Sequence, residues 1–159
     1  MRHLLILRHA KSSWSDGTLR DHERPLNGRG LKQATQLAKL LVEGGFSPSL
    51  ILSSDARRTE ETALLMEPIF DSVEVQFMHS LYLGELHDIH AALIAHGADH
   101  QTVLVLGHNP GFSLGAALLT NTAVELKTAC AAVLKSKSAD WEAAFMTKSF
   151  ELISVIEGR

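Results

Sequence analysis

Short apolar runs alternate along the chain with segments in which hydrophobic residues recur every three or four positions. The apolar runs have the length and aliphatic composition of buried strands, and they lie at residues 3–8, 49–52, 73–78, 102–106, 129–135 and 150–156. The segments with helical spacing lie at residues 28–43, 55–66, 85–96 and 110–118. Alternating strands and helices predict an α/β domain.

The helix expected between the first two strands carries the clearest apolar stripe. Its hydrophobic positions are Leu31, Ala34, Leu37, Ala38 and Leu41. This spacing predicts one helix that buries a single face. Asn27 is a suitable N-cap, and the Gly44-Gly45 pair is a suitable stop.

The next helix begins directly after a strand. Ser54 or Asp55 is expected to cap it, and Ala56, Ala63 and Met66 are expected on its buried face. Arg58 then lies in the first turn, where side chains and free backbone amides can converge on an anion.

Two stretches have weaker patterns. Residues 12–27 are polar and contain Gly17 and Pro25, which predicts a surface loop. Residues 136–147 fit either a hairpin or a helical turn. Pro110 suits the first position of the helix that continues through Leu114, Ala117 and Leu118.

Composition narrows the class of protein. A chain of 159 residues that is 45% hydrophobic and 21% charged is expected to form one globular domain over residues 1–159. A formal net charge of −3 argues against a nucleic-acid partner, because a phosphate backbone is bound mainly by Lys and Arg. The only cysteine, Cys130, lies in an apolar stretch and is expected to be a buried, inert thiol. No signal peptide or membrane span is recognisable, so we expect a cytoplasmic protein.

Two histidines end strand-like runs and are each followed by a turn-forming segment. His9 follows the first strand together with Arg8, and His108 follows the strand at 102–106. The carboxyl ends of neighbouring parallel strands form the crevice where ligands bind, so His9 and His108 are expected to meet there. Beside Arg8, the two imidazoles would form a site for an anion.

These residues also resemble a known family. Arg8-His9-Ala10 resembles the Arg-His-Gly signature of the histidine phosphatase superfamily, and Leu106-Gly107-His108 resembles its second conserved histidine. Residues 53–62 resemble the Ser-Pro-x-x-Arg-Ala-x-x-Thr segment, in a register that assigns the phosphate-binding arginine to Arg58 rather than to Arg57. The segments at 8–14 and 21–27 are similar to the phosphohistidine phosphatase (SixA-type) branch.

The resemblance implies a fold and a mechanism. The fold would be a three-layer α/β/α sandwich with a mixed, mostly parallel central sheet, as in phosphoglycerate mutase-like proteins. His9 would attack phosphorus and carry the phosphoryl group, Arg8 and Arg58 would clamp its oxygens, and His108 would donate a further hydrogen bond. Water would then release inorganic phosphate, with no metal and no cofactor.

Other residues lie in the sequence near this set. Lys11, Ser12 and Arg24 flank the expected site and are candidates for contacts with phosphate or substrate, whereas Arg57 is expected at the rim or surface. His22 and His79 are expected in loops. The remaining helix-associated histidines have spacings that suggest metal ligands, but no cysteine or carboxylate cluster accompanies them, and exposed positions are favoured: His87, His90, His96 and His100.

The leaving group is the main open question about the substrate. By the resemblance, Leu83 stands where many phosphoester-cleaving relatives carry an acid, and Glu85 is nearby but out of register. An alkoxide needs a proton from a general acid, whereas the imidazole of a phosphohistidine leaves more easily. We therefore expect a phosphohistidine phosphatase acting on a phosphorylated protein such as a phosphotransfer domain. The alternatives are a phosphatase of small phosphoesters that uses Glu85 or Asp88 as its acid, and a non-catalytic phosphate- or phosphohistidine-binding module.

Overall fold

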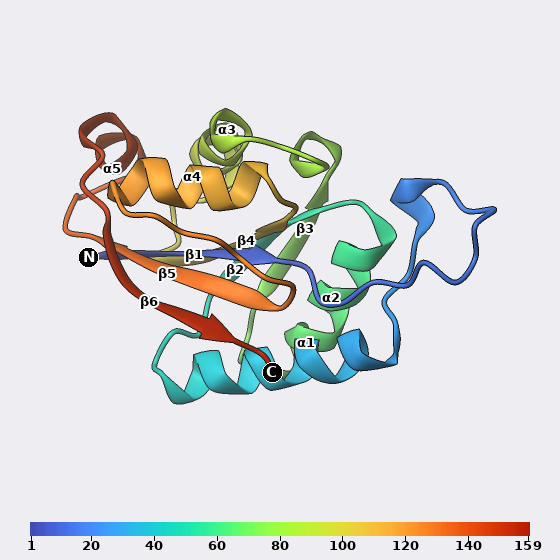
Figure 1. Cartoon of the computed structure of the whole chain (residues 1–159). Helices are drawn as coiled ribbons and strands as arrows, with labels where there is room; N and C mark the ends of the chain where they lie inside the picture. The colour runs from blue at the N-terminus through green and yellow to red at the C-terminus, as the bar shows by residue number, and fades with distance from the viewer.

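The computed structural model describes all 159 residues and is built around one six-stranded mixed sheet (Figure 1). The strands follow the spatial order β3-β2-β4-β1-β5-β6. They span Arg2–Arg8 (β1), Leu50–Ser54 (β2), Glu74–Met78 (β3), Thr102–Gly107 (β4), Cys130–Ser136 (β5) and Glu151–Glu157 (β6). Strands β1 to β4 are mutually parallel and β5 runs antiparallel to both of its neighbours, as expected for a mixed, mostly parallel sheet.

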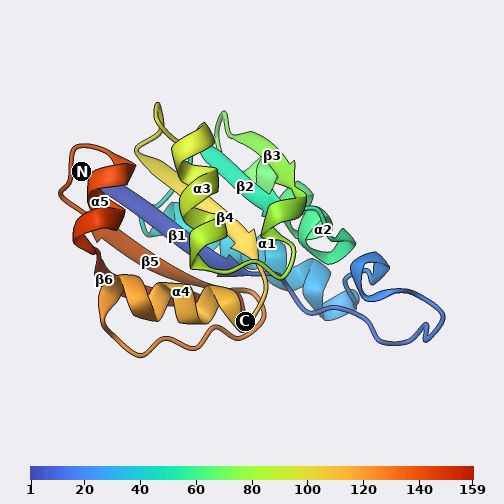
Figure 2. The same cartoon turned by 90° about the horizontal axis from the view of Figure 1, so that it is seen from above.

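Helices cover both faces of this sheet and give the predicted α/β/α sandwich (Figures 1 and 2). The two helices on one face are α1 (Gly28–Glu43) and α2 (Arg57–Met66). The other face carries α3 (Leu86–His96), α4 (Gly111–Thr120) and α5 (Trp141–Thr147). Each face buries its own hydrophobic cluster, of 17 residues under α1 and α2 and of 21 residues under the other three helices. None of these helices combines the length and the apolar composition that a membrane crossing requires.

The pairing of β1 with β4 sets the position of the site. Arg8 is the register partner of Gly107, so the residues that follow each strand, His9 and His108, leave the sheet side by side. Strand β2 pairs with the other edge of β4 and ends at Ser54, just before α2. Three chain segments that are distant in sequence therefore meet at one end of the sheet, where parallel strands expose their carboxyl ends.

Helix α1 confirms the predicted cap and most of the predicted stripe. The side chain of Asn27 accepts a hydrogen bond from the backbone N–H of Gly30 at 2.9 Å. Leu31 is nevertheless 48% exposed, so its assignment to the buried stripe is wrong. The inward position of this first turn is Gly30, because the main chain of Lys11 passes directly against it.

Two other helix starts differ from the predictions. Helix α2 has Ala56 at its N-cap and no side-chain cap, and the Asp55 carboxylate contacts two histidines instead. Helix α4 begins at Gly111, which leaves Pro110 at the N-cap rather than at the first helical position. Leu114 and Leu118 lie on the exposed face of α4.

The ambiguous segment near the C-terminus contains a helix. Asp140 caps α5 by accepting a hydrogen bond from the backbone N–H of Ala143 at 2.7 Å. Trp141 is buried and donates its indole N–H to the carbonyl oxygen of Gly97. Three short 3₁₀ helices complete the structure: η1 (Asp21–Glu23), η2 (Glu67–Ile69) and η3 (His79–Leu81).

Cys130 is a free, buried thiol, as predicted.

Candidate active site

His9 is buried at the end of β1 and is held in one tautomer. Its Nδ1 lies 2.7 Å from the carbonyl oxygen of Ala10, which can only accept, so Nδ1 carries the hydrogen. Its Nε2 accepts a hydrogen bond from Nε of Arg58 at 3.3 Å. The Nε2 atom therefore carries a lone pair that faces the cavity residues.

His108 is fixed in the opposite tautomer. Its Nδ1 lies 3.2 Å from a terminal nitrogen of Arg58, which can only donate. The hydrogen therefore lies on Nε2, which donates to Oγ of Ser54 at 2.8 Å. The two imidazole rings are 5.4 Å apart between centroids. Ser54 was not predicted to contact the site, although it ends the strand beside β4.

Arg58 lies between the two histidines and belongs to the first turn of α2, where it was predicted. Its guanidinium contacts the imidazoles of His9 and His108. It also donates hydrogen bonds to Asp21, to the backbone oxygen at 2.7 Å and to Oδ2 at 3.0 Å. Its side chain is buried. Arg57 points away from this centre and pairs with Glu61 on the surface.

Arg8 brings a second guanidinium to the pocket with spare hydrogen-bonding capacity. One of its terminal nitrogens donates to the carbonyl oxygen of Leu126 at 3.3 Å. Its Nε is buried and has no partner. A buried donor without an acceptor is costly, so this side of the pocket fits an anion that would accept from it.

Arg24 adds a third guanidinium, which is buried and is held by the loop that precedes α1. It donates to Oγ of Ser12 at 2.6 Å, to the backbone oxygen of Ser13 at 3.1 Å and to Oδ1 of Asp21 at 3.0 Å. The Trp14 ring stacks against it, with 3.2 Å between the guanidinium carbon and the ring centroid. Ser12 and Arg24 thus support one another, and Lys11 lies exposed beside them.

These side chains line a cavity of about 350 Å³. Its walls comprise Arg8, His9, Lys11, Ser12, Trp14, Asp21, Arg24, Arg58, Leu83, His108, Asn109 and Thr128. Three arginines and one lysine face a single carboxylate there, so positive charge is concentrated locally in a chain of net charge −3. Such a cavity is suited to a phosphoryl group.

Burial and the arginines keep both histidines neutral. Burial is the main cause that lowers the pKa of His9 to about 3, and the positive charges of Arg58 and Arg8 lower it further. Burial also dominates at His108, where Arg58 again contributes and the pKa is likewise about 3. A neutral imidazole retains the lone pair that a nucleophile needs.

Asp21 is the main site residue that the sequence did not identify. Burial acts to raise its pKa, but hydrogen bonds from Tyr82 and Arg58 outweigh burial and lower the pKa to about 2. The Tyr82 hydroxyl donates to Oδ2 of Asp21 at 2.5 Å. Asp21 is therefore an ionised carboxylate that accepts hydrogen bonds from Arg24 and Arg58. Asp21 begins the segment at residues 21–27 that resembles the SixA-type branch, and no other feature of the sequence indicated a role for it.

Two residues considered as acids lie away from the cavity. Glu85 is exposed at the N-terminus of α3, and Asp88 is bound to the backbone N–H of Glu85 at 2.8 Å. Leu83 does line the cavity, as expected for the residue at the position of the missing acid. The prediction that Glu85 contacts the substrate finds no support in this geometry.

The histidines outside the pocket that contact carboxylates fall into two groups. His87 pairs with Glu85 and Asp88, His90 pairs with Glu142, and His100 pairs with Glu74, so these histidines of the α3 region do not converge. His22 and His79 lie in η1 and η3, and both contact Asp55.

Comparisons with known proteins agree with this geometry. Residues 4–95 match the histidine phosphatase superfamily (branch 1). The chain is 40% identical over 157 residues to an uncharacterized chloroplastic protein of Arabidopsis thaliana, covering 91% of this chain and 71% of that protein.

Two solved structures share the whole fold. A putative phosphohistidine phosphatase SixA from Nakamurella multipartitia is 26% identical with a TM-score of 0.84, covering 98% of this chain and 95% of that one. A putative SixA from Agrobacterium tumefaciens is 25% identical with a TM-score of 0.81, covering 98% and 97%. The chain is therefore a phosphatase that belongs to the histidine phosphatase superfamily, branch 1, and has the fold of the SixA structures.

Proposed function

We propose that this phosphatase hydrolyses phosphohistidine on proteins through a covalent intermediate on Nε2 of His9. The observation that carries the proposal is the tautomer of His9, whose Nδ1 hydrogen is committed to Ala10 while Nε2 faces Arg58. An in-line nucleophile beside positive groups is what phosphoryl transfer requires.

The reaction has two steps. The lone pair on Nε2 of His9 attacks phosphorus, and the bond between phosphorus and the substrate's ring nitrogen breaks. The departing nitrogen keeps the bonding electron pair, and the substrate leaves as a neutral imidazole whose other ring nitrogen holds a proton taken from solvent. Water then attacks the phosphorus on His9, which releases inorganic phosphate and restores the neutral imidazole. Arg8, Arg24 and Arg58 would stabilise the charge on the phosphoryl oxygens in both steps.

Entry of a phosphoryl group requires a rearrangement at Arg58. In the structure its terminal nitrogens are occupied by Asp21 and His108. A phosphoryl oxygen would replace the Asp21 carboxylate as the acceptor. His108 gives its hydrogen to Ser54, so a hydrogen bond from its Nδ1 to phosphate would need a second proton, which the dianion would favour by raising the pKa of His108.

The absence of a suitable acid supports a phosphohistidine substrate. Asp21 is the only carboxylate lining the cavity, and a pKa of about 2 keeps it from holding a proton near neutral pH. Leu83 occupies the neighbouring wall. An imidazole leaving group needs less help from an acid than an alkoxide does, so this cavity fits a phosphoramidate better than an alkyl phosphate.

The proposal also covers the partner, the metal requirement and the compartment. We propose a phosphohistidine-containing protein, such as a phosphotransfer domain in signal transduction, as the partner, and turnover without a metal. The cytoplasm suits the single unpaired thiol of Cys130. The Arabidopsis relative is described as chloroplastic, so fractionation of the source cells is the direct test.

Rapid-quench labelling tests the mechanism. A ³²P-phosphohistidine protein is mixed with the enzyme and quenched in alkali within one turnover, and label is expected on His9 in an acid-labile, alkali-stable form. His9→Gln should abolish both the label and phosphate release. Label on another residue, or release without any labelled enzyme, would overturn the covalent mechanism. Binding without release would identify a non-catalytic module, and faster turnover of alkyl phosphates would favour the small-phosphoester alternative.

A further inference from the structure

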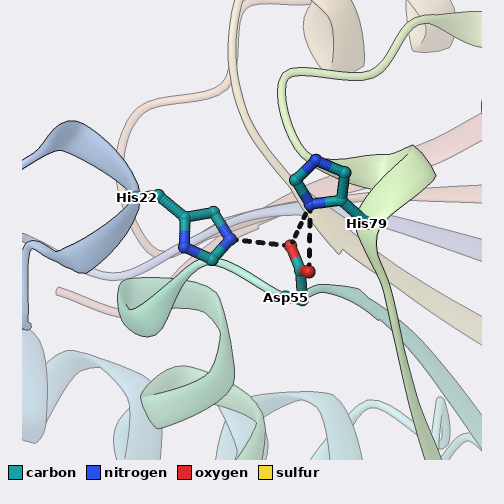
Figure 3. A group of neighbouring side chains, drawn as sticks. All are labelled: His22, Asp55 and His79. Atoms are coloured by element: carbon teal, nitrogen blue, oxygen red, sulfur yellow. Dashed lines mark hydrogen bonds and ion pairs between the residues drawn. The ribbon is translucent and has the colours of Figure 1, made fainter.

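Three side chains from distant parts of the sequence converge beside the catalytic cavity (Figure 3). His22 belongs to η1, Asp55 lies between β2 and α2, and His79 begins η3. Nε2 of His22 lies 2.8 Å from Oδ1 of Asp55. Nδ1 of His79 lies 3.1 Å from Oδ1 and 3.0 Å from Oδ2 of the same carboxylate.

We propose that His22, Asp55 and His79 form a binding site for a zinc-class divalent cation. Two imidazole nitrogens and one carboxylate are a donor set that Zn²⁺ takes readily, with water completing a four-coordinate site. Mg²⁺ and Ca²⁺ prefer sets made entirely of oxygen, so two imidazoles select against them. The site is separate from the metal-independent chemistry proposed at His9.

The spacing of the donor atoms fits such an ion. The three ligand atoms lie within 4.8 Å of one another. In a tetrahedral zinc site, ligand distances of about 2.0–2.1 Å put neighbouring donors roughly 3.3 Å apart. Small side-chain rotations are therefore sufficient to place all three donors around one ion. Figure 3 shows both imidazole rings with a nitrogen directed at the Asp55 carboxylate.

The surroundings leave room for a fourth ligand. A cavity of about 410 Å³ opens beside the cluster and is lined by Arg20, His22, Glu23, His79 and Tyr82. The Tyr82 ring packs edge-on against His22, with 4.8 Å between centroids, and limits how far that imidazole can turn. Arg20 is already paired with Glu23 at 3.2 Å, which reduces its repulsion of a cation.

Metal binding here would join segments that frame the active site. Asp21 is adjacent to His22, and it accepts hydrogen bonds from Arg58 and from Tyr82. An ion held by His22, Asp55 and His79 would fix η1 against the start of α2 and against η3. We therefore expect the metal to act as a clamp on the turn that carries Asp21.

Zinc titration of the metal-free, full-length protein tests the site. Competition against a chromophoric chelator should give one equivalent of Zn²⁺, and His22→Gln, Asp55→Asn and His79→Gln should each weaken the affinity by about tenfold or more. Co²⁺ should give the visible absorption of a four- or five-coordinate ion, and His79→Gln should remove it. Equal affinity in the wild type and these variants would overturn the proposal.

Two further variants serve as controls. The His87 side chain is 76% exposed, as is that of His79, and it also contacts two carboxylates, so His87→Gln tests whether any exposed histidine beside acids binds zinc. Its affinity should match the wild type. His9→Gln should also retain the site, and loss of zinc in that variant would assign the metal to the catalytic histidines instead.

Hydrogen exchange tests the clamp itself. Addition of Zn²⁺ should slow exchange of the backbone amides of residues 20–24 in the wild type and leave them unchanged in His79→Gln. Circular dichroism confirms that each variant is folded, and His79, being exposed, is the substitution least able to disturb the core. Zinc binding with no protection of residues 20–24 would refute the clamp.

Discussion

Arg58 is the single residue that contacts both histidines and Asp21, so its removal should be the most informative substitution in the pocket. Arg58→Ala should lower kcat/KM by about 10²–10³-fold, or roughly 3–4 kcal/mol of transition-state stabilisation, the scale of a lost oxyanion donor. Steady-state kinetics with a phosphohistidine protein measures this loss.

The neighbouring arginine is the matched control. Arg57 pairs with Glu61 on the surface, so Arg57→Ala should change kcat/KM little. Equal losses in the two variants, or a larger loss for Arg57→Ala, would contradict the placement of Arg58.

Leu83 gives a test of substrate choice at the same scale. Leu83→Glu would place a carboxyl group on the cavity wall, and it should raise activity on alkyl phosphates relative to phosphohistidine, because an alkoxide depends more on a general acid. The ratio of the two activities is the measured quantity, after thermal melting has shown that the variant folds.

Glu85→Gln is the complementary control, since Glu85 lies outside the cavity. It should leave phosphohistidine turnover largely unchanged. A collapse of turnover in the folded variant would make Glu85 the acid and favour the small-phosphoester alternative.

The sequence identified the central residues but not their partners. Arg8, His9 and His108 could be placed because strand ends have a fixed relation to a parallel sheet. Asp21 and Ser54 could not, because their contacts depend on how a 16-residue loop folds back and on which strand neighbours β4. Glu85 was a candidate because it is close to Leu83 in the sequence, but the structure does not place it among the residues that line the cavity.

At the scale of elements, the contact between α1 and the segment after β1 supports the pocket. A Cβ atom at Gly30 would lie only 2.1 Å from the backbone oxygen of Lys11. Gly30→Ala should therefore displace residues 10–12, destabilise the fold by about 1–3 kcal/mol and lower kcat, because His9 precedes the displaced segment. Urea unfolding and steady-state kinetics measure the two effects.

Gly28 provides the control for that substitution. It lies in the same first turn, and a Cβ there would meet nothing within 4 Å. Gly28→Ala should leave activity intact and keep or slightly raise stability, since alanine is the better helix former. Similar losses at both positions would show that helix propensity, rather than the contact with Lys11, controls the effect.

Strands and helices were predicted correctly where the spacing of hydrophobic residues alone indicates the type of secondary structure. The six strands and the first four helices follow from apolar spacing, but helix starts do not. The carboxylate of Asp55 could not be recognised as unavailable for capping, because its histidine partners come from residues 22 and 79. The segment containing α5 was ambiguous because its packing depends on residues distant in the sequence, such as the contact of the buried Trp141 with Gly97.

At the scale of the whole molecule, the burial of His9 and His108 at the strand ends both forms the site and lowers the free energy of unfolding at acidic pH. The sheet order puts β1 beside β4, and the helices on both faces bury the strand ends, so His9 and His108 are held neutral within a cluster of arginines. The unfolded chain has no such environment. Its histidines titrate near pH 6.5, whereas both pKa values in the folded protein are about 3.

This difference predicts the direction of the pH dependence of stability. Below pH 6.5, His9 and His108 bind protons in the unfolded state but not in the folded state. The free energy of unfolding therefore falls as the pH falls. The slope is up to about 1.4 kcal/mol per pH unit for each histidine until the pH reaches the pKa of the folded protein. Urea unfolding between pH 7 and 5 should show a loss of about 2 kcal/mol per histidine. The His9→Gln/His108→Gln double variant should have a markedly shallower slope, because it retains the same carboxylates and lacks these two sites. Parallel slopes for the two proteins would mean that His9 and His108 have the same pKa in the folded and unfolded states, and would contradict the lowering of their pKa by burial and by the arginines.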